Sequence, residues 1–387
     1  MAVISAGTMV LDGQVCRPGW VETSGTQILT CGPGPPPDQS RGTADSDFPD
    51  CVVVPGFIDM HVHGGGGGSY LQAEEIARAA GFHLAHGTTT TLASLVTTSP
   101  AELIAGVRAL ADATRQGTVA GIHLEGPWLS VARCGAHDHT QMRDPDPAEI
   151  DTVLAAGAGT IRMVTLAPER PGSDDAIRRF LGAGVVVAVG HTDATYEQTK
   201  HAVALGATVG THLFNAMPPL DHREPGPALA LLQHPRVTVE LIADGVHVHP
   251  AMVRAVIQAA GPNRVAVITD AIAAAGCDDG AFRLGTVAID VVSGVARVRG
   301  TSTIAGSTAT MDRLFRAVLE LGAVELGADP DAALAAAVQM TSATPARALS
   351  LKRVGRLRPG DDANLVVMDR DLQVRAVMVR GGWRVGD

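Results

Sequence analysis

Two histidines separated by one residue, His61 and His63, close an apolar run in the stretch IDMHVHGGGGGS, residues 58–69. The run before them reads as a buried strand, and side chains in a strand alternate between its two faces. Both imidazoles therefore project to the same side and could share one metal ion. The alternatives are a phosphate-binding glycine loop and a tight turn that only happens to carry histidines.

The five glycines at 64–68 do not fit a nucleotide-binding loop. Such a loop needs a lysine and a Ser or Thr after its glycines, whereas this one continues as SYLQAEE. Close approach of backbone at the mouth of a site explains the glycines better. The metal site is therefore the favoured interpretation.

Four more residues of metal-ligand or acid–base type stand at the ends of other apolar runs: Glu125, His191, His212 and Asp270. Each alone has a simpler explanation, such as a helix cap for Asp270 or a turn contact for Glu125. Six such residues at strand ends are harder to attribute to chance. Histidines combined with a carboxylate suit zinc or iron(II), and catalytic zinc keeps one position open for water.

The elements that must position these residues repeat as strand, loop and helix. Eight strands are predicted at 51–63, 87–96, 118–126, 160–168, 184–191, 207–214, 237–244 and 264–270. Helices are predicted between most of them, for example at 72–87, 100–116, 174–184 and 195–206. This pattern predicts an α/β fold with a parallel (β/α)8 TIM-type barrel, whose reacting groups lie at the carboxyl ends of its strands. An open doubly wound sheet is the alternative.

Both ends of the chain differ from this pattern. Residues 1 to about 30 and those from about 351 onward contain short alternating strands, and 31–50 reads as a proline-rich loop or linker. We expect the two ends to pair into a small β-sandwich. The predicted domains are 1–51 and 348–387 for the β-sandwich and 52–347 for the catalytic barrel.

Composition narrows the classes of partner. The net charge is -10 and no basic run appears, which argues against nucleic acid or an anionic membrane as the main partner. Five scattered cysteines indicate neither a disulfide framework nor a thiolate zinc site. The first residues lack the basic region of a signal peptide, and no apolar stretch approaches the roughly 20 residues of a membrane span. We therefore expect a cytoplasmic protein.

Several strings occur in an order that resembles the N-acetylglucosamine-6-phosphate deacetylases of the amidohydrolase superfamily. They include PGFIDMHVHG, GIHLEGPWLS, VGHTDATYEQ, THLFNAMPPLDHREPG, IADGVHVHP and VITDAIAAAG, and the resemblance covers essentially the whole chain. It implies a metal-dependent barrel with a β-sandwich built from both ends. It also implies hydrolysis of N-acetyl-D-glucosamine 6-phosphate to D-glucosamine 6-phosphate and acetate, in amino sugar catabolism and cell-wall sugar recycling.

The resemblance also implies roles for single residues. Glu125, His191 and His212 match the principal metal ligands of the family. Asp270 matches the carboxylate that takes a proton from the metal-bound water and later delivers it to the leaving amine. Positions that match sugar contacts are Ala136, His137, Asn215, Ala216, Arg223, Asp244, His247, Ile304, Ala305 and Gly306.

Arg223 and His247 are the natural phosphate holders, since a guanidinium can grip phosphate oxygens bidentately. In the family, phosphate contacts can come from the neighbouring subunit, so a homodimer is implied. Without the resemblance, Arg223 reads as a solvated surface charge.

Two features concern the metal. Some family members replace the two histidines after PGFID by amides and hold one ion, whereas this chain keeps His61 and His63. A second ion bridged through Glu125 and sharing Asp270 is therefore expected, with zinc first and iron, manganese or cobalt as alternatives. Cys134, just before His137, is either a free thiol or a thiol near the metal or substrate.

Two other functions remain open. Another amidohydrolase, such as a D-aminoacylase or a cyclic-amide hydrolase, would share the metal set without needing Arg223 and His247. A catalytically silent binding protein could keep the fold, but such a chain would usually have lost ligands, and here none is missing.

Overall fold

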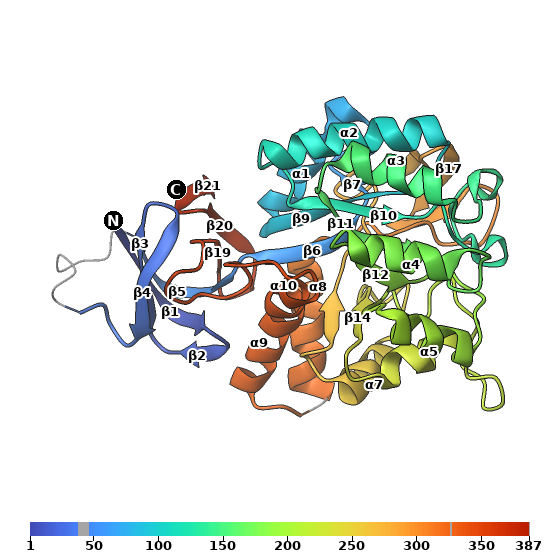
Figure 1. Ribbon diagram of the computed structural model, residues 1–387. Coiled ribbons are helices and arrows are strands. Elements are labelled where there is room, and N and C mark those ends of the chain that lie inside the picture. Colours follow the sequence, from blue (N-terminus) through green and yellow to red (C-terminus); the bar gives the residue numbers. More distant parts are fainter. Residues whose placement is uncertain (38–45, 326, 387) are drawn as a thin grey trace. The chain divides into compact units, whose positions relative to one another are not determined.

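The computed structural model describes residues 1–37, 46–325 and 327–386 (Figure 1). The chain forms two compact units, each made of several segments. The first comprises residues 1–59, 83–90 and 311–387, and the second comprises residues 60–82 and 91–310. The predicted limits of the barrel domain, 52–347, stay a prediction.

Eight parallel strands form one sheet whose spatial order follows the chain. They are β6 (Phe57–Val62), β9 (Thr88–Leu95), β10 (Gly121–Glu125), β11 (Ile161–Leu166), β12 (Val186–Val189), β13 (Val209–Gly210), β14 (Thr238–Leu241) and β15 (Val265–Val267). The segment after β15 returns to β6, where the Asp270 N–H donates to the His61 carbonyl (2.9 Å) and the His63 N–H donates to the Ala271 carbonyl (2.8 Å). The barrel prediction is therefore confirmed, and the open doubly wound sheet is wrong.

Helices follow most strands, as the alternation of patterns predicted. They are α1 (Ile76–Ala85), α2 (Pro100–Arg115), α3 (Pro147–Gly157), α4 (Ser173–Gly182), α5 (Tyr196–Leu205), α6 (Gly226–Gln233) and α7 (Pro250–Ala260). Local sequence sets their starts: Ser99 and Glu102 form a capping box at α2, and Thr195 and Gln198 form one at α5. Three later helices belong to the first unit: α8 (Met311–Glu320), α9 (Pro330–Val338) and α10 (Thr344–Ala348).

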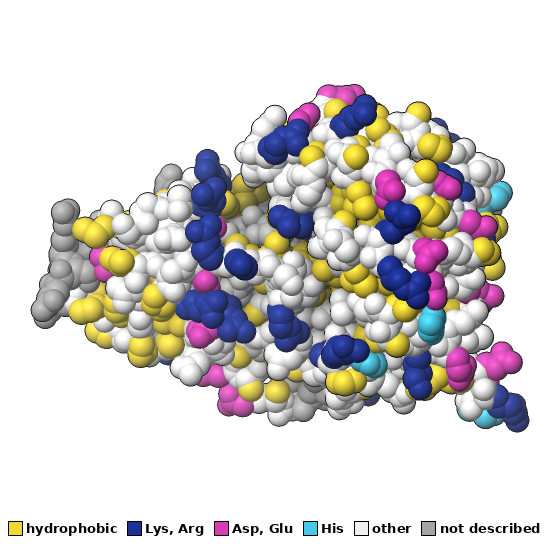
Figure 2. Space-filling model, in the orientation of Figure 1, with side chains coloured by type: hydrophobic (Ala, Val, Ile, Leu, Met, Phe, Trp, Pro, Cys, Tyr) yellow, Lys and Arg dark blue, Asp and Glu magenta, His cyan; other side chains and the backbone are white. Residues whose placement is uncertain are grey.

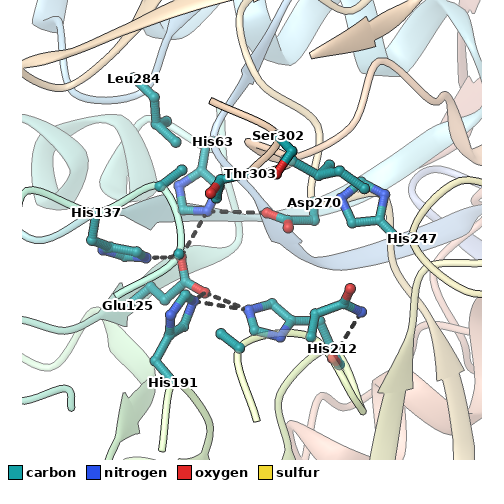
Figure 3. A pocket seen from close by; sticks show the side chains of 16 residues that line it. His63, Glu125, His137, His191, His212, His247, Asp270, Leu284, Ser302 and Thr303 are labelled. Atoms are coloured by element: carbon teal, nitrogen blue, oxygen red, sulfur yellow. Dashed lines mark hydrogen bonds and ion pairs between the residues drawn. The ribbon is translucent and has the colours of Figure 1, made fainter. Parts of the chain in front are cut away.

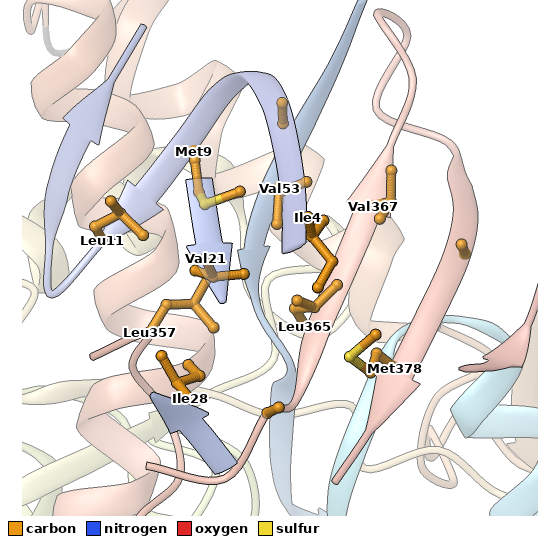
Figure 4. Close-up of a cluster of buried hydrophobic side chains, with 13 residues drawn as sticks. Ile4, Met9, Leu11, Val21, Ile28, Val53, Leu357, Leu365, Val367 and Met378 are labelled. Carbon is orange, nitrogen blue, oxygen red and sulfur yellow. The ribbon is translucent and has the colours of Figure 1, made fainter. Parts of the chain in front are cut away.

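Both ends of the chain meet in a second, predominantly antiparallel sheet, as expected. Its strands are β1 (Ala2–Leu11), β2 (Gln14–Cys16), β3 (Gly19–Ser24), β4 (Gln27–Pro33), β5 (Ser46–Pro55), β19 (Leu365–Met368), β20 (Val374–Val379) and β21 (Gly382–Val385). Strand β5 joins the two ends, because it pairs in parallel with β1 and antiparallel with β19. Figure 4 shows the core of this sheet, in which Ile4 and Val53 from the amino end pack with Leu365 and Met378 from the carboxyl end.

Two sequence expectations need correction here. The single strand predicted at 51–63 is two strands, because β5 ends at Pro55 in the terminal sheet and β6 begins at Phe57 in the barrel sheet. A Cβ on Gly56, the residue between them, would overlap the Thr89 side chain, so the crossing needs glycine. The loop predicted at 31–50 is shorter than expected, since β4 and β5 cover its two ends. Its central part, 38–45, lies outside the described residues.

A three-stranded antiparallel sheet follows the last barrel strand and was not expected. It consists of β16 (Gly280–Leu284), β17 (Val287–Val292) and β18 (Val295–Val298). Ile289 and Ala296 of this sheet pack with Ile272 in a separate hydrophobic cluster. A two-stranded pair, β7 (Gly64–Gly65) and β8 (Gly68–Ser69), accounts for the glycine run after His63. No helix among the described residues is both long and apolar enough to cross a membrane.

Candidate functional site

The residues predicted at the strand ends converge in two buried groups of possible metal ligands. The first, the His63 group, consists of His61, His63 and Asp270, and the second, the His191 group, consists of Glu125, His191 and His212. Within each group the ligand atoms lie within 4.8 Å of one another. The six positions come from strands far apart in sequence, so the barrel topology brings them together.

Distances within the His63 group are short. Nε2 of His61 lies 3.2 Å from Nε2 of His63, and Nε2 of His63 lies 3.3 Å from Oδ1 of Asp270. The His191 group has the same character, because Nε2 of His191 lies 3.1 Å from Nε2 of His212. Such contacts between ring nitrogens are unfavourable unless a proton or a cation lies between them.

Glu125 at the end of β10 lies between the two groups (Figure 3). Its Oε1 is 3.1 Å from Nε2 of His191 and 3.0 Å from Nε2 of His212. Its Oε2 is 3.1 Å from Nε2 of His63 and 3.1 Å from Nε2 of His137. One carboxylate thus faces both groups, as a bridging ligand would.

Three of the four histidines in the two groups have an acceptor at the other ring nitrogen. Nδ1 of His63 lies 3.2 Å from the Ser94 carbonyl, and Nδ1 of His191 lies 2.9 Å from the Arg133 carbonyl. Nδ1 of His61 lies 3.1 Å from a carboxylate oxygen of Glu240. Carbonyl oxygens only accept, so these Nδ1 atoms carry the proton and leave Nε2 to bind a cation, which is the usual arrangement around metal-bound histidines.

His137 has the opposite tautomer. The Thr97 N–H donates to its Nδ1 at 3.1 Å, so the proton is on Nε2, which donates to Oε2 of Glu125. Burial and then the nearby His191 lower the pKa of His137 to about 4, which keeps this ring neutral. His137 therefore acts in the structure as a hydrogen-bond donor to the shared carboxylate.

Three of the six proposed ligand residues have a backbone conformation that non-glycine residues rarely adopt. The φ angles of His191, His212 and Asp270 are 46°, 24° and 49°. Residues in this region cost free energy of about 1–3 kcal/mol each and persist only where surrounding structure holds them. Their presence at three ligand positions fits a site that was shaped for function.

Charges in the site shift the pKa values strongly. Burial alone raises the pKa of Asp270, but the charge of His61 and a hydrogen bond with His63 outweigh it and lower that pKa. Burial likewise raises the pKa of Glu125, and His61, His137 and His191 together bring it well below its usual value. Both carboxylates are therefore held ionised, as metal ligands or proton acceptors require.

A cavity of about 290 Å³ opens onto the two groups. Besides residues of the two groups, its lining includes most of the positions predicted to contact the sugar: Ala136, His137, Asn215, Ala216, His247, Ile304 and Gly306. Asp244 is not in the lining, but its Oδ2 lies 2.7 Å from Nδ1 of His247.

Like Asp244, two more predicted sugar-binding residues are absent from the cavity lining. Ala305 is buried in the hydrophobic cluster formed with the three-stranded sheet. Arg223 is exposed in a loop between β13 and α6 and is absent from the cavity lining. This loop, with its acidic, basic and histidine side chains, projects at the lower right of Figure 2. Within the described residues, no lysine or arginine lines the cavity.

Sequence reasoning missed several residues of the site. Leu284, Ser302 and Thr303 line the cavity from the three-stranded sheet and the segment after it, which carry no chemical motif. Glu240 and His123 are buried beside the ligands on β14 and β10. Each is a polar residue within a buried strand, a signal that could have been noticed because charged residues are seldom fully buried without a partner. Cys134 belongs to neither metal group, although its carbonyl accepts the His137 N–H at 3.0 Å.

Known proteins with the same architecture are numerous. The sequence profile of the amidohydrolase family matches residues 52–384. An N-acetylglucosamine-6-phosphate deacetylase of Bos taurus is 38% identical over 90% of this chain and 88% of its own length. An N-acetylgalactosamine-6-phosphate deacetylase of Escherichia coli O157:H7 is 36% identical over 85% and 87%.

The solved structures agree with the sequence relatives. A variant of the N-acetyl-D-glucosamine-6-phosphate deacetylase of Mycobacterium smegmatis, in complex with N-acetyl-D-glucosamine-6-phosphate, is 53% identical. It superposes with a TM-score of 0.95 over 99% of each chain. The chain therefore belongs to the amidohydrolase family, in the branch that contains the N-acetylglucosamine-6-phosphate deacetylases.

Proposed function

We propose that this protein hydrolyses the acetamide of N-acetyl-D-glucosamine 6-phosphate and releases D-glucosamine 6-phosphate and acetate. The observation that carries the proposal is the cavity over two complete groups of ligands, in a chain 53% identical to a deacetylase solved with that sugar phosphate. The reaction belongs to amino sugar metabolism, where we propose roles in catabolism and in recycling of cell-wall sugars. Since the substrate is a phosphorylated metabolite, we place the reaction in the cytoplasm.

The two groups fit divalent cations. Buried imidazole nitrogens and carboxylates suit zinc, which we propose as the metal, with iron, manganese or cobalt as alternatives. Glu125, His191 and His212 would hold one ion, and His61, His63 and Asp270 a second. When bound, such a cation lowers the pKa of water from about 16 toward about 7 and polarises a carbonyl.

Asp270 is the proposed catalytic carboxylate. Its side chain lines the cavity and is held ionised, so it can accept a proton from the attacking water. An amine leaves poorly as an anion, and return of that proton to the amide nitrogen makes carbon–nitrogen cleavage feasible. General acid–base assistance of this kind is typically worth about 10²- to 10⁴-fold in rate.

The cavity walls are proposed to hold the sugar. Asn215 and His247 offer polar groups, and Asp244 orients the His247 ring through the 2.7 Å contact. Thr303 and the backbone around Gly306 line the wall contributed after the three-stranded sheet. The neighbouring position Ala305 would then serve by packing this segment against its hydrophobic cluster.

We propose a homodimer in which Arg223 of one subunit reaches the phosphate bound by its partner. A phosphate ester needs positive charge, and no lysine or arginine of the described residues lines this cavity. Arg223 itself is exposed, and it follows by three residues Leu220, which lines an apolar hollow together with Met217, Pro219 and Met252 among others. Leu220 is 44% and Met252 38% exposed, which fits a surface that a second copy covers.

Acetate release is the direct test, measured with protein of known metal content on three acetylated sugars. N-acetylglucosamine 6-phosphate is expected to react fastest, and unphosphorylated N-acetylglucosamine tests the need for phosphate. N-acetylgalactosamine 6-phosphate tests the second relative's named substrate. Ring opening of a hydantoin, which releases no acetate and is followed separately, tests the cyclic-amide alternative. The proposal fails if N-acetylglucosamine 6-phosphate releases no acetate.

A further inference from the structure

We propose that Glu240 is a positioning residue that couples the two metal groups, an inference that rests on the proposed metal-dependent function. Oε2 of Glu240 lies 3.1 Å from Nδ1 of His61, a member of the His63 group. The same oxygen accepts the backbone N–H of His212, a member of the His191 group, at 3.2 Å. One carboxylate oxygen therefore holds a ligand of each group.

The position of Glu240 calls for an explanation. It lies on β14 between Val239 and Leu241, and all three residues are fully buried. A charge removed from water is costly unless it is paired and hydrogen-bonded, and an aliphatic side chain would fill a buried strand without that cost. The hydrogen bonds with His61 and His212 compensate for this cost and explain a carboxylate at this position.

The contact with His61 fixes the direction of the ring. A carboxylate oxygen only accepts, so Oε2 accepts from the His212 N–H, and the proton between Oε2 and His61 belongs to Nδ1. Nε2 of His61 is then left to bind a cation, and it faces Oε1 of Glu125 at 3.3 Å. Nδ1 of His63 and Nδ1 of His191 contact neutral backbone carbonyls instead. Because its partner is a carboxylate, His61 is therefore a more basic ligand than His63 or His191.

The contact with His212 holds the backbone at this residue in place. The Leu213 N–H donates to the Glu240 carbonyl at 2.9 Å, while the His212 N–H donates to the Glu240 carboxylate. Two successive peptide groups are thus tied to one residue, at the point where His212 has a φ of 24°. These bonds hold the strained turn that directs Nε2 of His212 toward Glu125.

Two substitutions separate charge from hydrogen bonding. Oε1 of Glu240 has no hydrogen-bond partner among the described residues, so the amide nitrogen of Glu240→Gln can occupy its place while the amide oxygen keeps both contacts. Glu240→Met keeps the length of the side chain and removes both contacts. Glu149→Gln is the matched control, because its carboxylate accepts hydrogen bonds from Arg143 outside the cavity.

The experiment is a calorimetric titration of the metal-free proteins with Co²⁺, together with their melting temperatures without metal. Loss of a residue that orients metal ligands typically lowers metal affinity by about 10- to 100-fold. We expect this loss at both sites in Glu240→Met, a smaller loss in Glu240→Gln, and wild-type affinities in Glu149→Gln. Glu240→Met in a His61→Asn background should still weaken the remaining site, through His212.

Three results would overturn the inference. Glu240→Met that binds two Co²⁺ ions with wild-type affinity would show that Glu240 does not position the ligands. Weakening of only one site would show that it does not couple the groups. A lower melting temperature with unchanged affinities would show a structural role alone. If the wild-type protein binds no Co²⁺, the proposed metal centre itself is refuted. This result does not depend on Glu240, so it is distinguished from the three above.

Discussion

Nε2 of His63 lies 3.3 Å from Oδ1 of Asp270, so the carboxylate that we assign to proton transfer also touches a proposed metal ligand. Asp270→Asn keeps the shape of the side chain and removes its ability to accept a proton. We expect kcat to fall at least about 10²-fold, the lower end of general acid–base contributions. Metal analysis of the same sample should find the ion of the His191 group retained. Near-normal turnover would refute the proton role.

Glu125 faces both groups, so its replacement should affect both ions. Glu125→Gln is expected to lose most of the bound metal, whereas His61→Asn should lower the content from two ions to one. Metal content per chain, determined on dialysed protein, distinguishes the two results. Two retained ions in Glu125→Gln would contradict a bridging role.

Stability of the metal-free protein should depend on pH through His63. Burial alone lowers the pKa of His63, but hydrogen bonds to Asp270 and Glu125 outweigh it and raise that pKa to about 9. A raised folded-state pKa stabilises the protein fully below the unfolded value of about 6.5, and this contribution is lost as pH rises through about 9. The melting temperature of the metal-free protein should therefore decrease as the pH is raised from about 6.5 to about 9. The decrease should be smaller in His63→Asn. A rising melting temperature over this range would contradict the assignment.

Arg223 should matter for the phosphate and not for the amide. Hydrogen bonds to charged groups are worth about 1.5–3 kcal/mol, so Arg223→Ala should lower kcat/KM for the phosphorylated sugar by about 10- to 100-fold. Turnover of the unphosphorylated sugar should be unchanged, and the exposed neighbour His222→Ala serves as control.

Mixing of subunits tests whether Arg223 acts across an interface. A heterodimer of Arg223→Ala and Asp270→Asn would contain one site with both Asp270 and a partner's Arg223. We expect two weakly active proteins to regain activity after mixing and subunit exchange. No gain, with exchange verified by mass, would place Arg223 in its own subunit's site.

Gly56 should tolerate no side chain. A Cβ there would overlap Thr89, and overpacking typically costs about 1–3 kcal/mol. Gly81 in α1 is the matched control, because a Cβ there meets nothing within 4 Å and alanine favours a helix by about 0.5–1 kcal/mol. Gly56→Ala should lower the melting temperature, and Gly81→Ala should leave it unchanged or raise it.

The sequence predicted the barrel and its strand-end residues because both follow from local patterns. A buried parallel strand is a run of apolar residues, and the polar residue that ends it marks the functional edge of the sheet. Glu125, His191 and His212 could be found in this way without knowledge of their neighbours. Which of these ligands share one ion depends on which strands are adjacent in the barrel, and this was predicted only from the resemblance to the deacetylases.

Other features depend on contacts that no local pattern contains. The crossing at Gly56 interrupts a continuous apolar run, so periodicity alone cannot show that the two halves belong to different sheets. Glu240 could be noticed as a charged residue in an apolar run, but its role could not be predicted because its partners, His61 and His212, are distant in sequence. Ala305 packs into a hydrophobic cluster, which its sequence motif does not show, and its contact with the sugar stays a prediction.

The pairing of β5 with β19 has a consequence for the order of events during synthesis. β5 is made early, and its partner strand at Leu365–Met368 is translated only after the entire barrel sequence. At roughly 5–20 residues per second, this delay is on the order of tens of seconds. Throughout that time a nascent chain carries an open strand edge, so a chain that is truncated before Leu365 keeps this edge open and is prone to pair with other chains.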